Sequence, residues 1–104
     1  MHFVALSLDR ADGLETRLAN RPAHLDFLKA HPDRIKIGGP LLAPDGERMI
    51  GSMLIVEARD EAEARALLAE DPYAKAGLFQ EVSVLPWRWV VNPPPVGDDA
   101  GGPG

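Results

Sequence analysis

Two side chains in this sequence have the chemistry needed to pass a proton, and they lie about fifty residues apart. His24 falls in the segment Arg-Pro-Ala-His-Leu at 21–25, and Asp71 falls in Glu-Asp-Pro-Tyr at 70–73. An imidazole titrates near neutral pH, and a carboxylate that bonds to it can fix its tautomer. If the fold brings His24 and Asp71 together, they form a general acid–base pair.

Both residues also have structural interpretations that the sequence leaves open. Asp71 precedes a proline, a common arrangement at a helix start, so it is also a candidate N-cap for a short turn over residues 73–76. The two roles of Asp71 are compatible. Pro22 suits the first position of a helix, which predicts that His24 lies in a first helical turn, where the helix dipole favours neutral imidazole. The alternative for His24 is a surface or half-buried histidine with a local partner.

Further candidates lie close to this pair in the sequence. Arg21 interrupts a row of leucines with helical spacing, and it is suited to bind an anionic substrate, to pair with Asp71, or to extend into solvent. Gly38-Gly39-Pro40 inside a strand pattern indicates a bulge, a strand end or a close approach to the backbone. The three histidines lack metal-ligand spacing and the chain has no cysteine, so we expect no metal site. No glycine-rich phosphate motif is present, and we expect no cofactor.

Bulk composition narrows the class of protein. The chain has 104 residues, enough for one domain, and its net charge is −5 with a pI near 5.0. An acidic protein is a poor partner for nucleic acid or an anionic membrane. The first residues do not fit a signal peptide, and no apolar run approaches the roughly 20 residues of a membrane span. Together with the lack of cysteine, these features predict a cytoplasmic protein.

Hydrophobic periodicity and the positions of proline and glycine predict the helices and strands that must position His24 and Asp71. Their order is strand, helix, strand, strand, helix, strand, the ferredoxin-like βαββαβ order. It implies an α+β fold with a four-stranded antiparallel sheet and the helices on one face. We expect Pro22 to break the first helical region and Pro86 to interrupt or bulge the last strand. The predicted strands are 2–8, 34–42, 48–57 and 79–91, and the predicted helices are 12–20, 22–31 and 60–70.

The two sheet faces and the C-terminal stretch add two expectations. The third strand is apolar on both faces, so both faces of the sheet should be covered. The helices cover one, and we expect a second copy of the chain to cover the other in a homodimer. We place the folded domain at 1–91. Residues 92–104 hold four prolines and four glycines, and we expect them to form a disordered tail because they cannot bury enough apolar surface.

Taken together, the short motifs resemble the YCII-related domain family. The resemblance implies a ferredoxin-like, dimeric α/β-barrel fold and an active site made of a histidine and an aspartate, here His24 and Asp71. Most members have no established reaction, and some eliminate HCl from chlorinated, hydroxylated aromatics. This chain departs from the family pattern at its tail and at residues 31–33. The motifs that carry the resemblance are Arg21 to Leu25, Gly39-Pro40, Asp71-Pro72-Tyr73 and Ala76-Gly77.

Two functions from different classes are compatible with these residues. The first is a small cofactor-independent enzyme of lyase or isomerase type, in which His24 and Asp71 transfer a proton on a small cyclic or aromatic metabolite. The second is a non-catalytic dimeric module that binds a metabolite or serves as an accessory protein. An enzyme requires the two side chains within hydrogen-bond reach beside an open pocket. The candidate substrate-binding residues are Arg21, Gly39, Pro40 and Tyr73.

Overall fold

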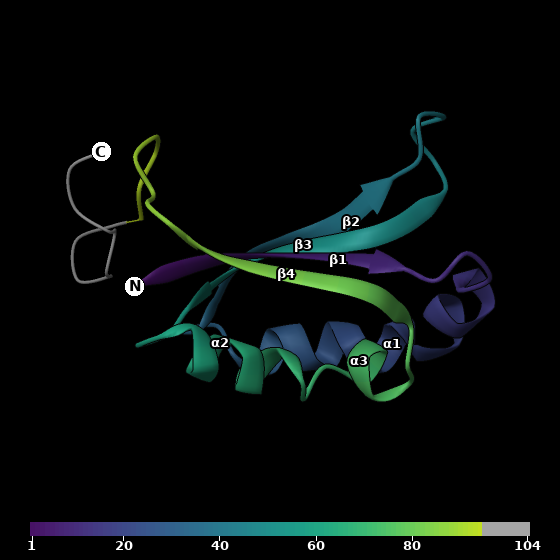
Figure 1. The fold of residues 1–104 in the computed structure, drawn as a ribbon, viewed down its shortest axis with the longest axis horizontal. Coiled ribbons are helices and arrows are strands. Elements are labelled where there is room, and N and C mark those ends of the chain that lie inside the picture. The colour runs from purple at the N-terminus through teal and green to yellow at the C-terminus, as the bar shows by residue number, and fades with distance from the viewer. Residues whose placement is uncertain (95–104) are drawn as a thin grey trace.

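A computed structural model describes residues 1–94 as one sheet with helices packed on one of its faces (Figure 1). The strands are β1 (His2–Asp9), β2 (Ile35–Leu42), β3 (Met49–Glu57) and β4 (Phe79–Trp87). The helices are α1 (Leu14–Ala30), α2 (Glu61–Leu68) and α3 (Pro72–Lys75). All neighbouring strands are antiparallel, in the order β2-β3-β1-β4. The predicted α+β, ferredoxin-like fold is confirmed, with the short α3 added before the last strand.

Two further expectations concern the C-terminal tail and the absence of a membrane span. The predicted disordered tail at 92–104 lies mostly outside the described residues, which end at 94. Within the described part of the chain, no helix is long and apolar enough to cross a membrane.

The apolar core lies between the sheet and the helices. Side chains alternate along a strand, so Phe3 and Ala5 of β1 face the helices while Val4 and Leu6 face the other way. The burial of apolar surface in this core stabilises the fold by roughly 25 cal/mol for each Å² removed from water. The buried cluster consists of Phe3, Ala5, Leu54, Val56, Ala58, Ala64, Leu67 and Val84.

The starts of α2 and α3 follow the sequence signals. Asp60 precedes α2, and its Oδ1 accepts a hydrogen bond of 2.8 Å from the backbone N–H of Glu63, as an N-cap does. Asp71 caps α3 in the same way, with Pro72 in the first turn. The cap interpretation of Asp71 is therefore correct, and it fixes where α3 begins.

The first helical region is one continuous helix rather than two, so the predicted break at residue 22 is wrong. Pro22 lies inside α1, where a proline removes one backbone donor and costs about 3 kcal/mol. Buried side chains on both sides of it, Arg17 and His24, hold α1 against the rest of the fold. His24 consequently lies in the middle of a helix, and the argument from a helix terminus does not apply to its imidazole.

The last strand also differs from its prediction. β4 ends at Trp87, and Pro86 pairs in register with Phe3, without a bulge. Because β4 is an edge strand, Pro86 can lack an N–H without interrupting the ladder. The register shift instead falls between Leu8 and Asp9 of β1. Bulges re-aim side chains, and the Asp9 carboxylate at this one is bonded to α1.

Candidate functional site

The fold brings His24 and Asp71 into direct contact. Nδ1 of His24, from the middle of α1, lies 2.8 Å from Oδ1 of Asp71, in the connection between α2 and α3. The two side chains are only 8% and 4% exposed. Burial shields this bond from water, which strengthens it and holds both groups in one geometry.

The direction of this hydrogen bond decides which ring nitrogen is available. An ionised carboxylate only accepts, so we assign the proton to Nδ1 of His24, which donates to Asp71. Nε2 of the neutral ring then carries the free lone pair. The arrangement can take up a proton at Nε2, and Asp71 stabilises the imidazolium that results.

Tyr73 holds the same two residues from another direction. Its backbone N–H donates to Oδ1 of Asp71 at 2.9 Å, the oxygen that also accepts from His24. Its ring stacks on the imidazole of His24, with ring centroids 3.9 Å apart and planes 15° apart. Tyr73 is buried, and this burial raises the pKa of its phenol above the ordinary value. The imidazole is therefore fixed by one bond at its edge and one ring on its face.

A buried arginine, which sequence reasoning missed, completes the cluster. Arg17 is 2% exposed and donates from Nε and Nη2 to the two carboxylate oxygens of Asp9, at 2.7 and 2.9 Å. Nη2 also donates to Oγ of Ser52 at 2.8 Å, and the guanidinium carbon lies 4.6 Å from the ring centre of Tyr73. Burial opposes the charge, yet the bonds to Asp9 raise the pKa of Arg17 above its ordinary value.

One signal in the sequence points to Arg17. It lies seven residues before His24, two helical turns away, so the two share one face of a continuous helix. The predicted break at Pro22 hid this relation. Of the leucines that seemed to mark a helical stripe, Leu14, Leu18 and Leu25 are 43%, 52% and 38% exposed, whereas Leu28 packs against the core.

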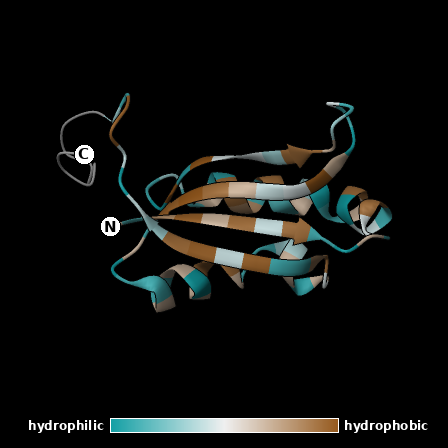
Figure 2. Cartoon of the chain, turned by 45° about the horizontal axis from the view of Figure 1, so that its top comes forward, coloured by the Kyte–Doolittle hydropathy of each residue, from teal (hydrophilic) through white to brown (hydrophobic). Residues whose placement is uncertain are grey.

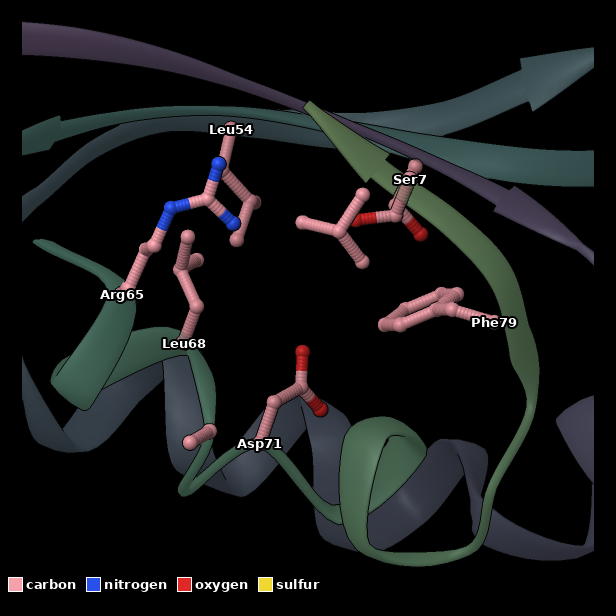
Figure 3. A pocket seen from close by; sticks show the side chains of 9 residues that line it. Ser7, Leu54, Arg65, Leu68, Asp71 and Phe79 are labelled. Atoms are coloured by element: carbon pink, nitrogen blue, oxygen red, sulfur yellow. The ribbon is translucent and has the colours of Figure 1, made fainter. Parts of the chain in front are cut away.

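Two cavities adjoin the His24–Asp71 pair, one lined by His24 and the other by Asp71. The one we call the His24 cavity has a volume of about 150 Å³. The one we call the Asp71 cavity has a volume of about 200 Å³ (Figure 3). The His24 cavity is lined by Arg17, Arg21, His24, Leu25, Leu28, Gly38, Gly39, Pro40, Met49, Ser52 and Tyr73. The Asp71 cavity is lined by Ser7, Ser52, Leu54, Arg65, Leu68, Ala69, Asp71, Phe79 and Val82.

The candidate substrate-binding residues all line the His24 cavity. Arg21 is exposed there, and within residues 1–94 no ion pair joins it to Asp71. Gly39 and Pro40 lie on β2 in regular register with β3, so the glycine–proline segment is not a bulge. A side chain at Gly38 would place its Cβ 2.5 Å from Cδ2 of Leu54, so a larger residue there would have to displace the Leu54 side chain, while the space beside Gly39 is open.

A metal site requires several ligating side chains gathered around one point. In the part of the chain that the structure describes, no group of three or more histidine, aspartate or glutamate residues is placed to hold a metal ion. The cluster is a hydrogen-bonded histidine and carboxylate beside small cavities.

The model of the YCII-related domain matches residues 1–88. The chain belongs to the YCII-related domain family. Protein YciI of Escherichia coli O6:H1 is 38% identical over 97 residues, which cover 86% of this chain and 99% of that protein. The derivative of benzaldehyde biosynthesis cluster protein C of Emericella nidulans is 39% identical over 75 residues, covering 64% of this chain and 76% of the other.

Among solved structures, the chain resembles an enzyme with a named activity. This is the 5-chloro-2-hydroxyhydroquinone dehydrochlorinase TftG of Burkholderia phenoliruptrix AC1100, in complex with 2,5-dihydroxybenzoquinone. The TM-score is 0.76 and the identity 37%, over 85% of this chain and 94% of that one. The similarity agrees with the ferredoxin-like fold of the dimeric α/β-barrel type.

Proposed function

We propose that this chain is a small cofactor-independent enzyme that moves a proton on a cyclic or aromatic metabolite by lyase or isomerase chemistry. The observation that carries the proposal is the 2.8 Å bond between Nδ1 of His24 and Oδ1 of Asp71, buried beside a cavity that His24 lines. The name of the relative TftG, a dehydrochlorinase, supports the lyase class, because loss of HCl from an organic substrate is an elimination.

In the proposed reaction, Nε2 of His24 is the general base. It removes a proton from the substrate, and the electrons of the broken bond form a double bond. In an elimination a leaving group departs with its own electron pair, whereas in an isomerisation the proton returns from Nε2 to another atom. Asp71 stabilises the imidazolium, and Arg21, at the exposed side of the His24 cavity, supplies a positive charge near the substrate.

Substitution of either member of the pair tests this function. We expect His24→Ala and Asp71→Asn each to reduce the rate at least about 100-fold, the usual contribution of a general acid–base group. The double variant should be little slower than either single variant, because residues that act as one unit are not additive. The measurement is chloride release from 5-chloro-2-hydroxyhydroquinone and related ring compounds, with circular dichroism to check the fold.

Leu18→Ala on the exposed face of α1 serves as the control, and it should keep the wild-type rate. A His24→Ala variant that turns over substrate at the wild-type rate would remove His24 from the mechanism and contradict the proposal.

We also propose that two copies of the chain pair through the sheet face opposite the helices. Figure 2, which looks onto this side of the sheet, shows hydrophobic residues along the strands. The side chains that contribute are half-buried or exposed in the single chain, and Leu6, Ile37 and Leu85 are 36%, 39% and 56% exposed. An apolar face of this kind is favourable only when it is covered.

The dimer proposal is tested by size. We expect light scattering at micromolar concentration to give the mass of a dimer and Leu85→Glu to give that of a monomer, because a charge on this face would be buried without a partner. Leu18→Glu, which puts the same charge on the outer face of α1, is the matched control and should stay dimeric. A monomeric wild-type chain would rule out this pairing.

A further inference from the structure

The carboxylate of Asp71 has one oxygen bonded to the protein and one that is not. Both hydrogen bonds to the carboxylate of Asp71, from Nδ1 of His24 and from the backbone N–H of Tyr73, end on Oδ1. Within residues 1–94, no hydrogen bond reaches Oδ2. Asp71 also lines the Asp71 cavity, and Figure 3 shows its carboxylate directed into that space. Oδ2 is therefore open to the cavity, where a ligand can donate a hydrogen bond to a charged acceptor.

The walls of the Asp71 cavity are otherwise mainly apolar. Leu54, Leu68 and Phe79 surround the space in front of the carboxylate, and Ser7 faces it from the sheet side (Figure 3). The hydroxyl of Ser7, like Oδ2 of Asp71, has no hydrogen-bond partner among the described residues. The site therefore combines an apolar chamber with an acceptor on one wall and a hydroxyl on the opposite wall, the usual composition of a small-molecule site.

Volume and charge define what fits. The cavity measures about 200 Å³, and an apolar protein cavity of about 150 Å³ can hold benzene. One six-membered ring with a small substituent therefore fits. The carboxylate of Asp71 repels an anion at this depth, and the guanidinium of Arg65 is held at 2.9 Å by Glu61 on the exposed surface of α2. These charges favour a neutral ligand.

We propose that the Asp71 cavity is a binding site for a neutral, ring-sized molecule that donates a hydroxyl hydrogen bond to Oδ2 of Asp71. It is distinct from the His24 cavity, with which it shares only Ser52 among the lining residues. The ligand bonds to the same carboxylate that orients His24, so its binding changes the environment of the imidazole. This site goes beyond the proposed function, because its occupation requires no turnover.

Three probes of similar ring size test the ligand chemistry on the intact chain. Phenol carries the donor, toluene lacks it, and benzoate replaces it with a negative charge. In ligand-observed NMR titrations we expect phenol to bind and toluene to bind about ten-fold more weakly, since it forms no hydrogen bond to a charged acceptor. Benzoate should bind more weakly than toluene, and phenol should shift the ring signals of His24. Equal binding of all three probes, or no binding of phenol, would overturn the proposal.

A matched pair of cavity-filling variants tests the location. Val82→Phe fills the Asp71 cavity from β4, where Val82 is 37% exposed and an aromatic residue suits the strand. Leu25→Phe makes a similar change in the His24 cavity from α1, where Leu25 is 38% exposed. We expect Val82→Phe to weaken phenol binding about ten-fold or more, as excluded ligand atoms lose their contacts, and Leu25→Phe to leave it unchanged.

The reverse result would place phenol in the His24 cavity and overturn this inference. If Val82→Phe is poorly folded, Ala69→Leu fills the same cavity from the helical end of α2, where the backbone is helical and accepts leucine. Failure of the proposed enzyme function would appear as an active His24→Ala variant, whereas failure of this site would appear as phenol binding that ignores both Val82→Phe and Ala69→Leu.

Discussion

α1 and α2 pack on the same sheet, yet they bury opposite kinds of residue. The buried positions of α2 are Ala64 and Leu67, the usual apolar stripe of an amphipathic helix. The buried positions of α1 are Arg17 and His24, while Leu14, Leu18 and Leu25 are exposed and Leu28 is only partly buried against the core. α2 contributes to the core, whereas α1 carries the polar cluster. The difference shows that the inner face of a helix is set by what it must contact, and at this site it contacts a carboxylate, a phenol ring and a buried ion pair.

The sharpest way to test this contrast is to break the ion pair of α1. Asp9→Ala leaves the guanidinium of Arg17 buried without its partner, so we expect a loss of about 3–5 kcal/mol of unfolding free energy in urea denaturation. Replacing both residues by apolar ones of similar size, as in Asp9→Leu with Arg17→Met, should recover most of that loss. If Asp9→Ala costs less than about 1 kcal/mol, the guanidinium of Arg17 is solvated or bonded to another group in the variant. The ion pair on the inner face of α1 would then contribute no more than a surface pair does.

Two identical substitutions compare the helices directly. Leu67→Ala in α2 should cost about 2–5 kcal/mol, because it opens a cavity in the core. Leu18→Ala in α1 should change stability by no more than about 0.5 kcal/mol, because the side chain is on the surface. Thermal or urea unfolding of the two variants measures both values. Similar losses at the two positions would mean that the outer face of α1 is covered, for example by another molecule.

The smallest expected effect concerns Tyr73, which lies in α3 and stacks on His24 of α1. Burial raises the pKa of its phenol above the ordinary 10.0, although Arg17 opposes the shift. The folded chain then holds the phenolic proton more tightly than the unfolded chain. This stabilisation is complete below the unfolded pKa and is lost as the pH rises through the folded pKa. We expect the wild type to lose stability more steeply than Tyr73→Phe above a pH of about 10.

The chain contains a single tyrosine, so its ionisation can be followed by tyrosinate absorbance without interference from others. A midpoint of the tyrosinate titration at or below 10.0 would contradict the burial argument for Tyr73. It would also indicate that the ring stack on His24 is looser than the structure shows.

The sequence predicts the fold well where local signals and burial agree. Alternation located the strands, and Asp60 and Asp71 marked the starts of two helices. The prediction failed where a tertiary contact overrides a local signal. Pro22 reads locally as a helix start, but contacts on both sides keep α1 continuous. Pro86 suggests a bulge, but an edge strand tolerates it.

For the candidate site, the motifs singled out His24 and Asp71 together with Arg21, Gly39, Pro40 and Tyr73 of the His24 cavity, and the fold brings them together. Arg17 escaped notice because the predicted break at Pro22 hid its place on the same helix face as His24, and because nothing local shows that its partner Asp9 would be buried with it. The Asp71 cavity could not be foreseen either, since its walls come from three strands and the end of α2, and only the packed structure defines the space between them.

Asp71 has a consequence for how this position tolerates mutation. One atom, Oδ1, both caps α3 and receives the proton-bearing nitrogen of His24. Asparagine and serine cap helices about as well as aspartate, but neither carries the negative charge that would stabilise an imidazolium. A library of variants selected only for folding would thus accept several residues at position 71, and a library selected for turnover would retain aspartate. A screen for stability alone therefore detects the helix-capping role of Asp71 and does not detect its proposed role in stabilising the imidazolium.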